Sequence, residues 1–266
     1  MKAAVVAGYG TLPKIAAENL LKKGHSVLVV ALDEAVSIGF SDIQGISLEK
    51  ISVTQVGRLI KLLKKYDIES VLFAGKVNKA LIFSNLKFDL LAVKVLAGLK
   101  NRKDDTIMDA ICRLVTAEGM QIMEQTYALD NLYLQKGVYS KLKPTTEQEK
   151  DISFGYDTAK ELGRLDVGQT VVVKNSAVMA LEAIEGTDQA IERGCRLAKE
   201  GAVVVKCAKP SQDLRFDIPT VGVDTLKILH DNKGKVLAVE ADSTFVVEID
   251  KCIRFADENK LVFLAI

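Results

Sequence analysis

The sequence predicts an α/β protein of two lobes, with a Rossmann-like parallel sheet in the N-terminal lobe and a mixed sheet in the C-terminal one. Apolar runs alternate with amphipathic segments in the first 130 residues, which is the pattern of strand–helix–strand units. A stretch near residues 127–146 loses this periodicity, and a second alternation follows it. We therefore predict a first domain over 1–130, a linker over 131–147 and a catalytic α/β domain over 148–266.

The first lobe is expected to alternate buried strands with amphipathic helices. The expected strands are residues 2–8, 25–32 and 69–77, and the expected helices are residues 12–24, 53–68 and 104–119. Right-handed crossovers place these strands in one parallel sheet covered by helices. Asp104 and Asp105 stand where they can cap the last of these helices.

A long aliphatic stretch that contains several lysines overlaps the third of these strands. Residues 72–100 carry many large aliphatic side chains with a lysine every few positions. We interpret this stretch first as a core helix whose lysine stems cover apolar surface, and second as a surface that meets lipid.

The second lobe carries its own alternation and a predicted hairpin. The apolar runs on either side of Asn175 and Ser176 predict two antiparallel strands joined by a tight turn. A sheet that combines such a hairpin with crossover strands is mixed. The expected helices are residues 151–165, 187–201 and 224–232, and the expected strands are residues 169–175, 177–185, 202–208, 220–223, 235–241 and 244–249.

Composition excludes several classes of protein. The 266 residues carry a formal net charge of +1, so nucleic acid, whose binding normally needs a clustered basic excess, is not an expected partner. Four cysteines without CxxC spacing and an N-terminus without a signal-peptide pattern favour a reducing cytoplasm. No run approaches about 18 apolar residues, so no membrane span is expected. The only histidines, His25 and His230, have no Ser or Cys neighbour and are expected to be structural.

The most informative segment is KPSQDLRFDIPTVG at residues 209–222, a charged loop between two apolar runs. It brings Lys209, Arg215 and Asp217 together with Asp213 next to two prolines. A solvated loop gains nothing from holding both signs of charge at rigid positions, so the segment predicts a site. A surface turn with an ion pair is the alternative.

A second candidate segment is EGTD at residues 185–188, where a strand ends and a helix begins. Thr187 is the expected N-cap. Glu185 and Asp188 add negative charge at a helix N-terminus that itself attracts anions, which suggests a cation between the protein and a phosphate. An ordinary helix cap is the alternative. In a hydrolase without suitable histidines, the base or the metal ligands must come from such carboxylates.

The loop GYGTLP, after the first expected strand, is a candidate phosphate contact. Gly8, Gly10 and Thr11 precede a helix, where backbone N–H groups can approach a phosphate. Asp33 stands at the end of the second strand, where dinucleotide-binding folds place a ribose-binding carboxylate. Pro13 replaces the third glycine of the fingerprint, which argues against a nicotinamide site. A merely structural tight turn is the alternative.

Two further charged segments of the first lobe are weaker candidates. Lys76 and Asn78 stand at the end of the third expected strand. Lys103 and Asp104 precede the helix over 104–119. Each segment could contribute contacts to an anionic ligand.

With these residues in place, the sequence resembles the LpxI-type UDP-2,3-diacylglucosamine pyrophosphatases of lipid A biosynthesis. EGTD followed by KPSQDLRFDIPTVG at this spacing is the distinctive part. The matching pieces, in order along both lobes, are GYGTLP at 8–13, FAGKVNK at 73–79, KDD at 103–105, GRLDVGQTVVV at 163–173, ALEAIEGTD at 180–188, VVKCAKPSQDLRFDIPTVG at 204–222 and the C-terminal VVEIDKCIRFADENKLVFLAI.

The resemblance implies an enzyme that hydrolyses the pyrophosphate of UDP-2,3-diacylglucosamine to UMP and 2,3-diacylglucosamine 1-phosphate, called lipid X. It implies Mg²⁺ or another divalent cation, a substrate held between the lobes, and an essential aspartate at Asp217. We expect Asp217, Asp188 and Lys209 to serve catalysis, and Asp217, Asp188 and Glu185 to hold the metal. The expected substrate-binding residues are Gly8, Gly10, Thr11, Lys76, Asn78, Lys103, Asp104, Thr187, Gln212 and Arg215.

The acyl chains of such a substrate raise the odds of the lipid interpretation of residues 72–99. The sequence leaves open a peripheral contact with the cytoplasmic face of the inner membrane, and a homodimer. Two other functions stay open. One is a nicotinamide-dependent oxidoreductase, which depends on Gly8, Gly10 and Asp33. The other is a lipid or nucleotide carrier, which needs neither a metal nor an attacking water.

Overall fold

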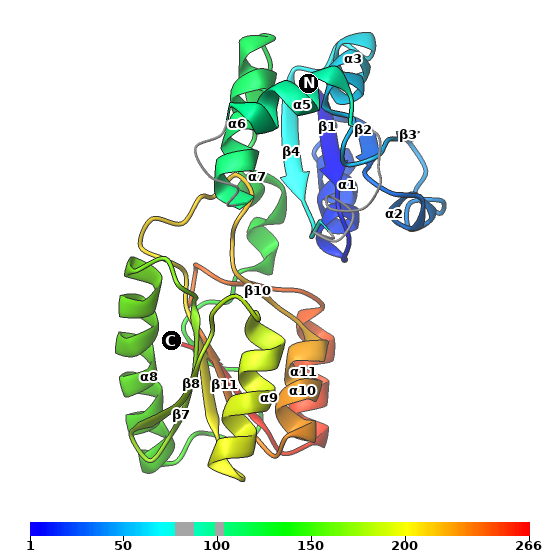
Figure 1. Cartoon of the computed structure of the whole chain (residues 1–266). Coiled ribbons are helices and arrows are strands. Elements are labelled where there is room, and N and C mark those ends of the chain that lie inside the picture. The colour runs from blue at the N-terminus through cyan, green and yellow to red at the C-terminus, as the bar shows by residue number, and fades with distance from the viewer. Residues whose placement is uncertain (78–87, 99–103) are drawn as a thin grey trace. The chain divides into compact units, whose positions relative to one another are not determined.

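The computed structural model describes residues 1–77, 88–98 and 104–266, which form two compact units (Figure 1). The first unit comprises Met1–Asp130 and the short segment Leu214–Phe216. The second comprises Asn131–Asp213 and Asp217–Ile266. The predicted domain limits stay a prediction. The predicted linker over 131–147 contains a short strand of the second unit and the beginning of its first long helix.

The first unit is built on a five-stranded parallel sheet, as predicted. The strand order is β3-β2-β1-β4-β5. The strands are β1 (Lys2–Ala7), β2 (Ser26–Ala31), β3 (Ile46–Lys50), β4 (Ser70–Ala74) and β5 (Gln121–Ile122). The two short outer strands were not predicted, because β3 is partly exposed and β5 has only two residues, so neither forms a buried apolar run.

Helices cover both faces of this sheet. They are α1 (Leu12–Lys22), α2 (Glu34–Ile38), α3 (Val56–Lys65), α5 (Leu90–Ala97), α6 (Asp104–Ala117) and α7 (Gln125–Leu129). Residues of α3 and α6 pack against Ala4 and Val6 of β1, in a cluster that Phe216 also joins. The strand order turns back after β3, so right-handed crossovers place α1 on the opposite face. There α1 buries Ala16, Ala17 and Leu20.

The interpretation of residues 72–100 as one core helix was wrong. The stretch begins inside β4, whose five residues are all buried. Its only described helix is α5, where Leu90 is 83% exposed and Val93 is 51% exposed. An aliphatic run with regular lysines is compatible with a buried strand followed by an amphipathic helix. The strand β4 ends before Gly75, whose φ of 88° is not a strand conformation. Residues 78–87 and 99–100 lie outside the described part of the chain.

The second unit is built on a mixed sheet, as predicted. The strand order is β6-β13-β11-β9-β7-β8. The strands are β6 (Gly137–Val138), β7 (Thr170–Lys174), β8 (Ala177–Leu181), β9 (Val203–Lys206), β11 (Val236–Val239) and β13 (Val262–Ala265). The three central strands β13, β11 and β9 are parallel, and β7 runs antiparallel to both β9 and β8. A separate pair joins β10 (Thr220–Val221) to β12 (Phe245–Val246).

The predicted hairpin between β7 and β8 is confirmed. Asn175 and Ser176 have φ of 52° and 57°, the left-handed values that a two-residue hairpin turn requires. Their backbone N–H groups donate to the carboxylate of the buried Asp151, over 3.0 and 2.6 Å. A side chain from the neighbouring helix therefore stabilises a turn that local sequence alone leaves strained.

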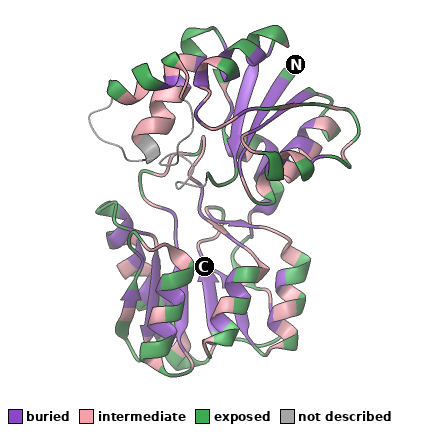
Figure 2. Ribbon diagram, turned by 45° about the vertical axis from the view of Figure 1, so that its right-hand side comes forward, coloured by how far each residue is buried: buried purple, intermediate pink, exposed green. Residues whose placement is uncertain are grey.

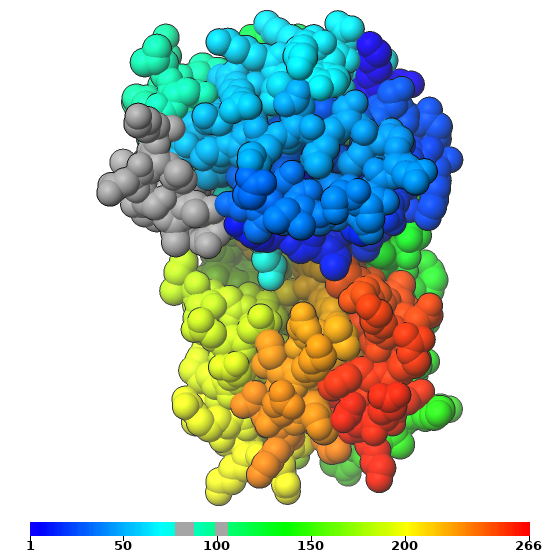
Figure 3. Space-filling model, turned by 90° about the vertical axis from the view of Figure 1, so that its right-hand side faces the viewer, coloured from blue at the N-terminus to red at the C-terminus, as the bar shows by residue number. Residues whose placement is uncertain are grey.

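Helices α8 (Thr146–Arg164), α9 (Thr187–Ala198), α10 (Val223–Asp231) and α11 (Ile249–Glu258) cover the mixed sheet. Residues of α8 pack on one face of the sheet, in one core cluster. The other three helices pack on the opposite face and lie side by side in the yellow, orange and red parts of Figure 3. In each unit the central strands are buried, the outer strands are partly exposed, and the helices expose their outer sides (Figure 2).

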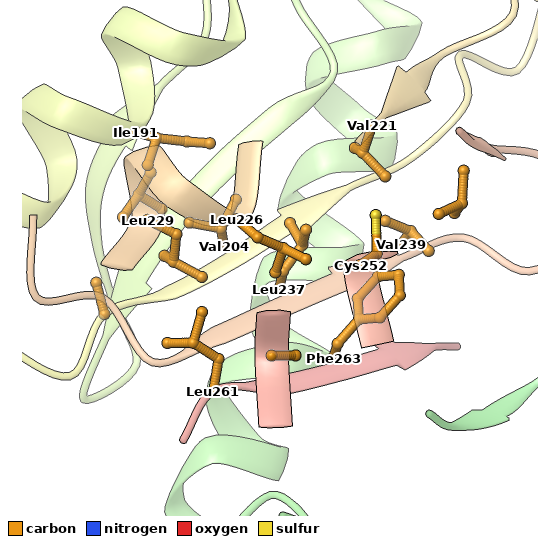
Figure 4. Packing of buried hydrophobic residues seen from close by; sticks show 14 of the residues in the cluster. Ile191, Val204, Val221, Leu226, Leu229, Leu237, Val239, Cys252, Leu261 and Phe263 are labelled. Atoms are coloured by element: carbon orange, nitrogen blue, oxygen red, sulfur yellow. The ribbon is translucent and has the colours of Figure 1, made fainter. Parts of the chain in front are cut away.

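The core beneath these three helices is aliphatic with one aromatic ring. Leu226 and Leu229 of α10 point toward Leu237 of β11 and Phe263 of β13 (Figure 4). All four side chains have no exposed surface. Helix α8 begins at Thr146, five residues before the predicted start, because Thr145 and Gln148 form a capping box.

Substitution of Gly194 should test the close approach of α9 to the sheet. A Cβ added at Gly194 would lie 2.5 Å from Cβ of Val172 in β7. We expect Gly194→Ala to lower the free energy of unfolding by about 1–3 kcal/mol through overpacking, despite the higher helix propensity of alanine. Urea denaturation measures this effect. Gly137→Ala is the control, because no atom lies within 4 Å of its added Cβ. A more stable Gly194→Ala variant would contradict the packing.

Candidate active site

The chemistry-bearing segments of the second unit meet at one edge of its sheet. Strands β8 and β9 both run antiparallel to β7, so they run in the same direction as each other, and β11 is parallel to β9. Their carboxyl ends therefore share one edge, which we call the strand-end edge. The segments that leave it are the EGTD turn after β8, the charged loop after β9, and Glu240 after β11. This is the convergence that both candidate motifs require.

Asp217 is held by the charged loop that contains it. Nε2 of Gln212 donates to the Asp217 carboxylate over 2.7 Å and also to its backbone carbonyl. The Asp217 N–H donates to the carbonyl of Asp213 over 3.0 Å, which closes a turn. The side chain of Asp217 keeps 35% of its surface exposed. A carboxylate that is held by hydrogen bonds and is still partly exposed can act on a ligand from solvent.

Lys209 lies between two carboxylates at the same place. Its Nζ is 3.0 Å from Oδ1 of Asp166 and 3.6 Å from Oδ2 of Asp217. Only 18% of the Lys209 side chain is exposed, and its N–H donates to Oε1 of Gln212 over 3.0 Å. Gly163 belongs to helix α8, and a Cβ added to it would lie 3.2 Å from Cα of Lys209. Helix α8 therefore packs closely against the charged loop. Lys209 is thus a positioned cation beside Asp217.

Glu240 supports this loop from inside and was not predicted. Its carboxylate accepts from Nζ of Lys160 over 2.8 and 3.1 Å, from the N–H of Ala208 over 2.7 Å and from the hydroxyl of Tyr156 over 3.2 Å. Burial, with the nearby Glu240 charge, raises the pKa of Cys207 to about 12, so this thiol stays protonated. The only feature of the sequence that could have identified Glu240 is its position as a single acidic residue at the end of an apolar strand.

Lys206 and Glu182 are two further residues that sequence reasoning missed. Lys206 ends β9 and is buried, and its Nζ donates to Oγ1 of Thr187 over 2.9 Å. The Thr187 hydroxyl donates in turn to Oε1 of the buried Glu182 over 2.9 Å. Thr187 was expected to cap its helix and contact substrate, but it is the first residue of α9, and Gly186 holds the N-cap position. A lysine inside a valine run was the available signal.

The three carboxylates predicted to hold a metal are not gathered in this structure. Glu185 forms an ion pair with Arg193, whose guanidinium lowers the pKa of that carboxyl. Asp188 is exposed in the first turn of α9. Over residues 1–77, 88–98 and 104–266, no three His, Cys, Asp or Glu side chains lie together as a metal-holding group. Asp188, Glu185 and Asp217 do not fit a preformed cage for a divalent ion.

Arg215 was expected to meet phosphate, but it is grouped with the first unit. Its Nη2 is 3.2 Å from Oδ1 of Asp109 in α6, and its guanidinium lies 5.3 Å from the ring centroid of Phe216. The neighbouring N–H of Gln125 donates to the carbonyl of Leu214 over 2.9 Å. These contacts account for the inclusion of Leu214–Phe216 in the first unit, and the phosphate role of Arg215 stays a prediction.

The glycine loop after β1 is packed against the loop after β4 at Gly8 and Tyr9. The N–H of Gly8 donates to the carbonyl of Ala74 over 2.9 Å, and Tyr9 and Lys76 exchange two backbone hydrogen bonds over 2.7 and 2.8 Å. A Cβ on Gly8 would lie 2.4 Å from the Lys76 carbonyl oxygen. Glycine is needed here for backbone packing. The N–H groups of Gly8 and Tyr9 are already used, whereas no side chain caps α1 at Thr11.

The remaining first-lobe candidates that the structure describes stand in the loops after β1 and β4 and at the N-termini of α2 and α6. Asp33 accepts from the N–H of Ala35 over 2.8 Å as the N-cap of α2, so it has a structural role where a ribose ligand was considered. Gly10 has φ of 105°, the left-handed region that favours glycine, and the Lys76 side chain is exposed. Asp104 is the first residue of α6. Asn78 and Lys103 lie outside the described residues.

Two models of known protein domains together match nearly the whole chain. The LpxI N-terminal domain matches residues 2–132, and the LpxI C-terminal domain matches residues 135–264. A relative from Caulobacter vibrioides, described as UDP-2,3-diacylglucosamine pyrophosphatase LpxI, is 29% identical over 276 aligned positions that cover 100% of this chain and 97% of the relative. Within the described residues, no helix is both long and apolar enough to cross a bilayer.

Solved structures are similar only over part of the chain. A UDP-glucose-4-epimerase from Stenotrophomonas maltophila is 20% identical and covers 46% of this chain and 35% of its own length, with a TM-score of 0.30. The yeast methylglyoxal/isovaleraldehyde reductase Gre2 is 12% identical and covers 52% of this chain and 65% of its own length, with a TM-score of 0.31. TM-scores this low support no conclusion about function.

Removal of the Glu240 carboxylate should destabilise the second unit. Glu240→Ala leaves Lys160 and the N–H of Ala208 without their acceptor in a site where Glu240 is only 13% exposed. We expect a loss of about 2–3 kcal/mol in the free energy of unfolding, measured by urea denaturation. Glu161→Ala on α8, the helix that carries Lys160, breaks an exposed pair with Arg164 and should cost under about 0.5 kcal/mol. Equal effects would show that Glu240 is not a support.

Proposed function

This chain belongs to the LpxI family, and from that membership we propose that it hydrolyses the diphosphate of UDP-2,3-diacylglucosamine to UMP and 2,3-diacylglucosamine 1-phosphate. The family domains cover both units, so the proposal concerns the whole chain. Hydrolysis of the diphosphate leaves one phosphate on the uridine, which gives UMP, and the other on the diacylated sugar. The reaction belongs to lipid A synthesis.

The observation that carries the proposal is the placement of Asp217 at the strand-end edge. Its carboxylate is oriented by Gln212, stands 3.6 Å from the Lys209 ammonium and is 35% exposed. Diphosphate hydrolysis needs a group that orients water beside a cation that offsets charge on the phosphate oxygens. Asp217 and Lys209 supply this pair at one point of the surface of the second unit.

In the proposed reaction, a water oxygen bonds to one phosphorus while the bond from that phosphorus to the bridging oxygen breaks. The Asp217 carboxylate orients the water and accepts its proton as the new bond forms. The bridging oxygen leaves with the other phosphate, and Lys209 stabilises the charge that develops on the phosphate oxygens. Gln212 holds Asp217 in the orientation that this proton transfer requires.

We also propose a requirement for a divalent cation, although the three predicted carboxylates do not gather. Mg²⁺ is commonly held by one or two carboxylates together with substrate phosphates, so a preformed protein cage is not needed. The diphosphate itself can bring such an ion. When bound, it would neutralise phosphate charge, and Asp217 is the carboxylate of the predicted set that stands beside Lys209.

The acyl chains of the substrate need an apolar surface on the protein or a membrane beside it. Helix α5 exposes Leu90 and Val93, at 83% and 51%. A helix that turns large aliphatic side chains to solvent suits contact with acyl chains at a membrane surface. We therefore propose that the cytoplasmic protein meets its substrate by peripheral contact through α5.

Neutralisation of Asp217 should stop turnover and leave the fold intact. Asp217→Asn keeps the shape of the side chain but cannot accept the proton from water, so we expect kcat for UMP release to fall by about a hundredfold or more. Thermal unfolding checks that the variant is folded. Asp224→Asn is the control, because Asp224 is 86% exposed on α10. Wild-type release of UMP by Asp217→Asn would show that the assigned role is wrong.

Chelation should separate the metal requirement from the reaction itself. We expect EDTA to abolish release of UMP from UDP-2,3-diacylglucosamine, and excess Mg²⁺ to restore it, because the cation neutralises the diphosphate. UMP is measured by chromatography at matched ionic strength. Undiminished release in EDTA would remove the metal from the proposal and leave the hydrolysis standing. Absence of UMP under every metal condition would remove the hydrolysis.

A further inference from the structure

Lys206 is a buried charge at the end of a valine strand. It is the last residue of β9 and only 5% of it is exposed. An ammonium group removed from water is costly unless hydrogen bonds compensate it, so its partners determine whether this placement is stable. Lys206 is paired in register with Thr170 on one side and Val239 on the other, which puts it in the middle of the strand-end edge.

Two hydrogen-bond partners of Lys206 come from separate segments of the chain. Nζ donates to Oγ1 of Thr187 over 2.9 Å and to the backbone carbonyl of Thr220 over 3.1 Å. Thr187 belongs to the EGTD turn, and its hydroxyl continues to Oε1 of Glu182 over 2.9 Å. Thr220 begins β10, three residues after Asp217. One ammonium group therefore joins the two motifs that carry the proposed chemistry.

Hydrogen bonds position the loop that carries Asp217 from both of its sides. Gln212 and the carbonyl of Asp213 hold it from the N-terminal side. On the C-terminal side, Pro219 accepts from the N–H of Phe245 over 2.8 Å, which attaches the chain to β12 but not to the main sheet. The Lys206 bond to the Thr220 carbonyl attaches this side of the loop to the strand-end edge.

We propose that Lys206 is a positioning residue that ties the EGTD turn and the Asp217 loop to the end of β9. Its effect on turnover rests on the proposed function, because it acts through Asp217. Glu182 and Thr187 complete the connection. The other carboxylate oxygen of Glu182, Oε2, is buried and has no hydrogen-bond partner among the described residues, so this acid also depends on the nearby Thr187 hydroxyl and Lys206 ammonium for compensation.

Lys206→Met is the first test, because it keeps the aliphatic stem and removes both hydrogen bonds. With UDP-2,3-diacylglucosamine as substrate, we expect kcat to fall about tenfold or more while KM stays within about twofold, since a displaced Asp217 loses transition-state interactions and not ground-state binding. The matched control is Lys174→Met in β7. Lys174 lies at the opposite edge of the same sheet, with Nζ 3.4 Å from the Gly201 carbonyl, and should retain wild-type kcat.

Amide hydrogen exchange tests the same inference without activity. We expect Lys206→Met to exchange about tenfold faster than wild type in both residues 182–190 and residues 216–222, and Lys174→Met to match wild type there. If wild type releases no UMP, the proposed function fails, yet the exchange experiment still decides whether Lys206 ties the two segments. Wild-type exchange in both segments, or wild-type kcat, overturns the inference.

Thr187→Val keeps the inference testable if Lys206→Met does not fold. Valine matches the shape of threonine but removes the hydroxyl between Lys206 and Glu182, and it leaves the bond from Lys206 to the Thr220 carbonyl. We expect faster exchange over residues 182–190 only, with kcat lowered less than in Lys206→Met. Unchanged exchange over residues 182–190 in this variant would also overturn the inference.

Discussion

The sheet of the second unit is buried on both faces, and this constraint decides where its chemistry can be. Helix α8 covers one face, and α9, α10 and α11 cover the other, so the central strands carry apolar side chains until they end. Charged groups can enter only where a strand ends and the helices no longer cover it. Lys206 at the end of β9 and Glu240 after β11 mark this limit. The candidate active site is a consequence of that burial.

The same constraint explains why the charged loop is ordered. Glu240 accepts from the backbone of Ala208 at the beginning of the loop, and Lys206 donates to the backbone of Thr220 at its end. Between these anchors, Gln212 bonds to both Lys209 and Asp217. Mixed charges are stable here because each has a nearby partner of the opposite sign or a hydrogen bond. The open side of Asp217 is then the part left for a ligand.

The glycine loops of the two units serve different physical needs. Gly8 allows the backbone after β1 to meet the backbone after β4, where any side chain would collide with the Lys76 carbonyl. Gly186 has φ of 84° and opens α9 in a conformation that residues with a Cβ rarely adopt. A glycine beside a helix N-terminus therefore indicates a close approach or a special backbone conformation, and a phosphate is only one explanation.

Local patterns in the sequence determined most of the regular structure. The valine-rich runs of β1, β2, β7 and β9, the amphipathic α1 and α3, and the Asn175–Ser176 turn all follow from periodicity and turn chemistry over a few residues. The short strands β3, β5 and β6 did not follow, because pairing with a neighbouring strand and not a local apolar run defines them. Helix α11 and strand β13 were not predicted either.

The sequence by itself also placed Lys209 and Asp217 in one charged loop and marked the family through EGTD and RFDIPT. Only the tertiary structure decided which partner each charge takes. Glu185 pairs with Arg193 instead of a metal group, and Arg215 pairs with Asp109. Such pairings depend on distances between residues up to 106 positions apart in the chain. The periodicity of a sequence indicates which face of a strand or helix a residue occupies, but not which charged residue lies opposite it. The pairing between charged residues determines what the site can do.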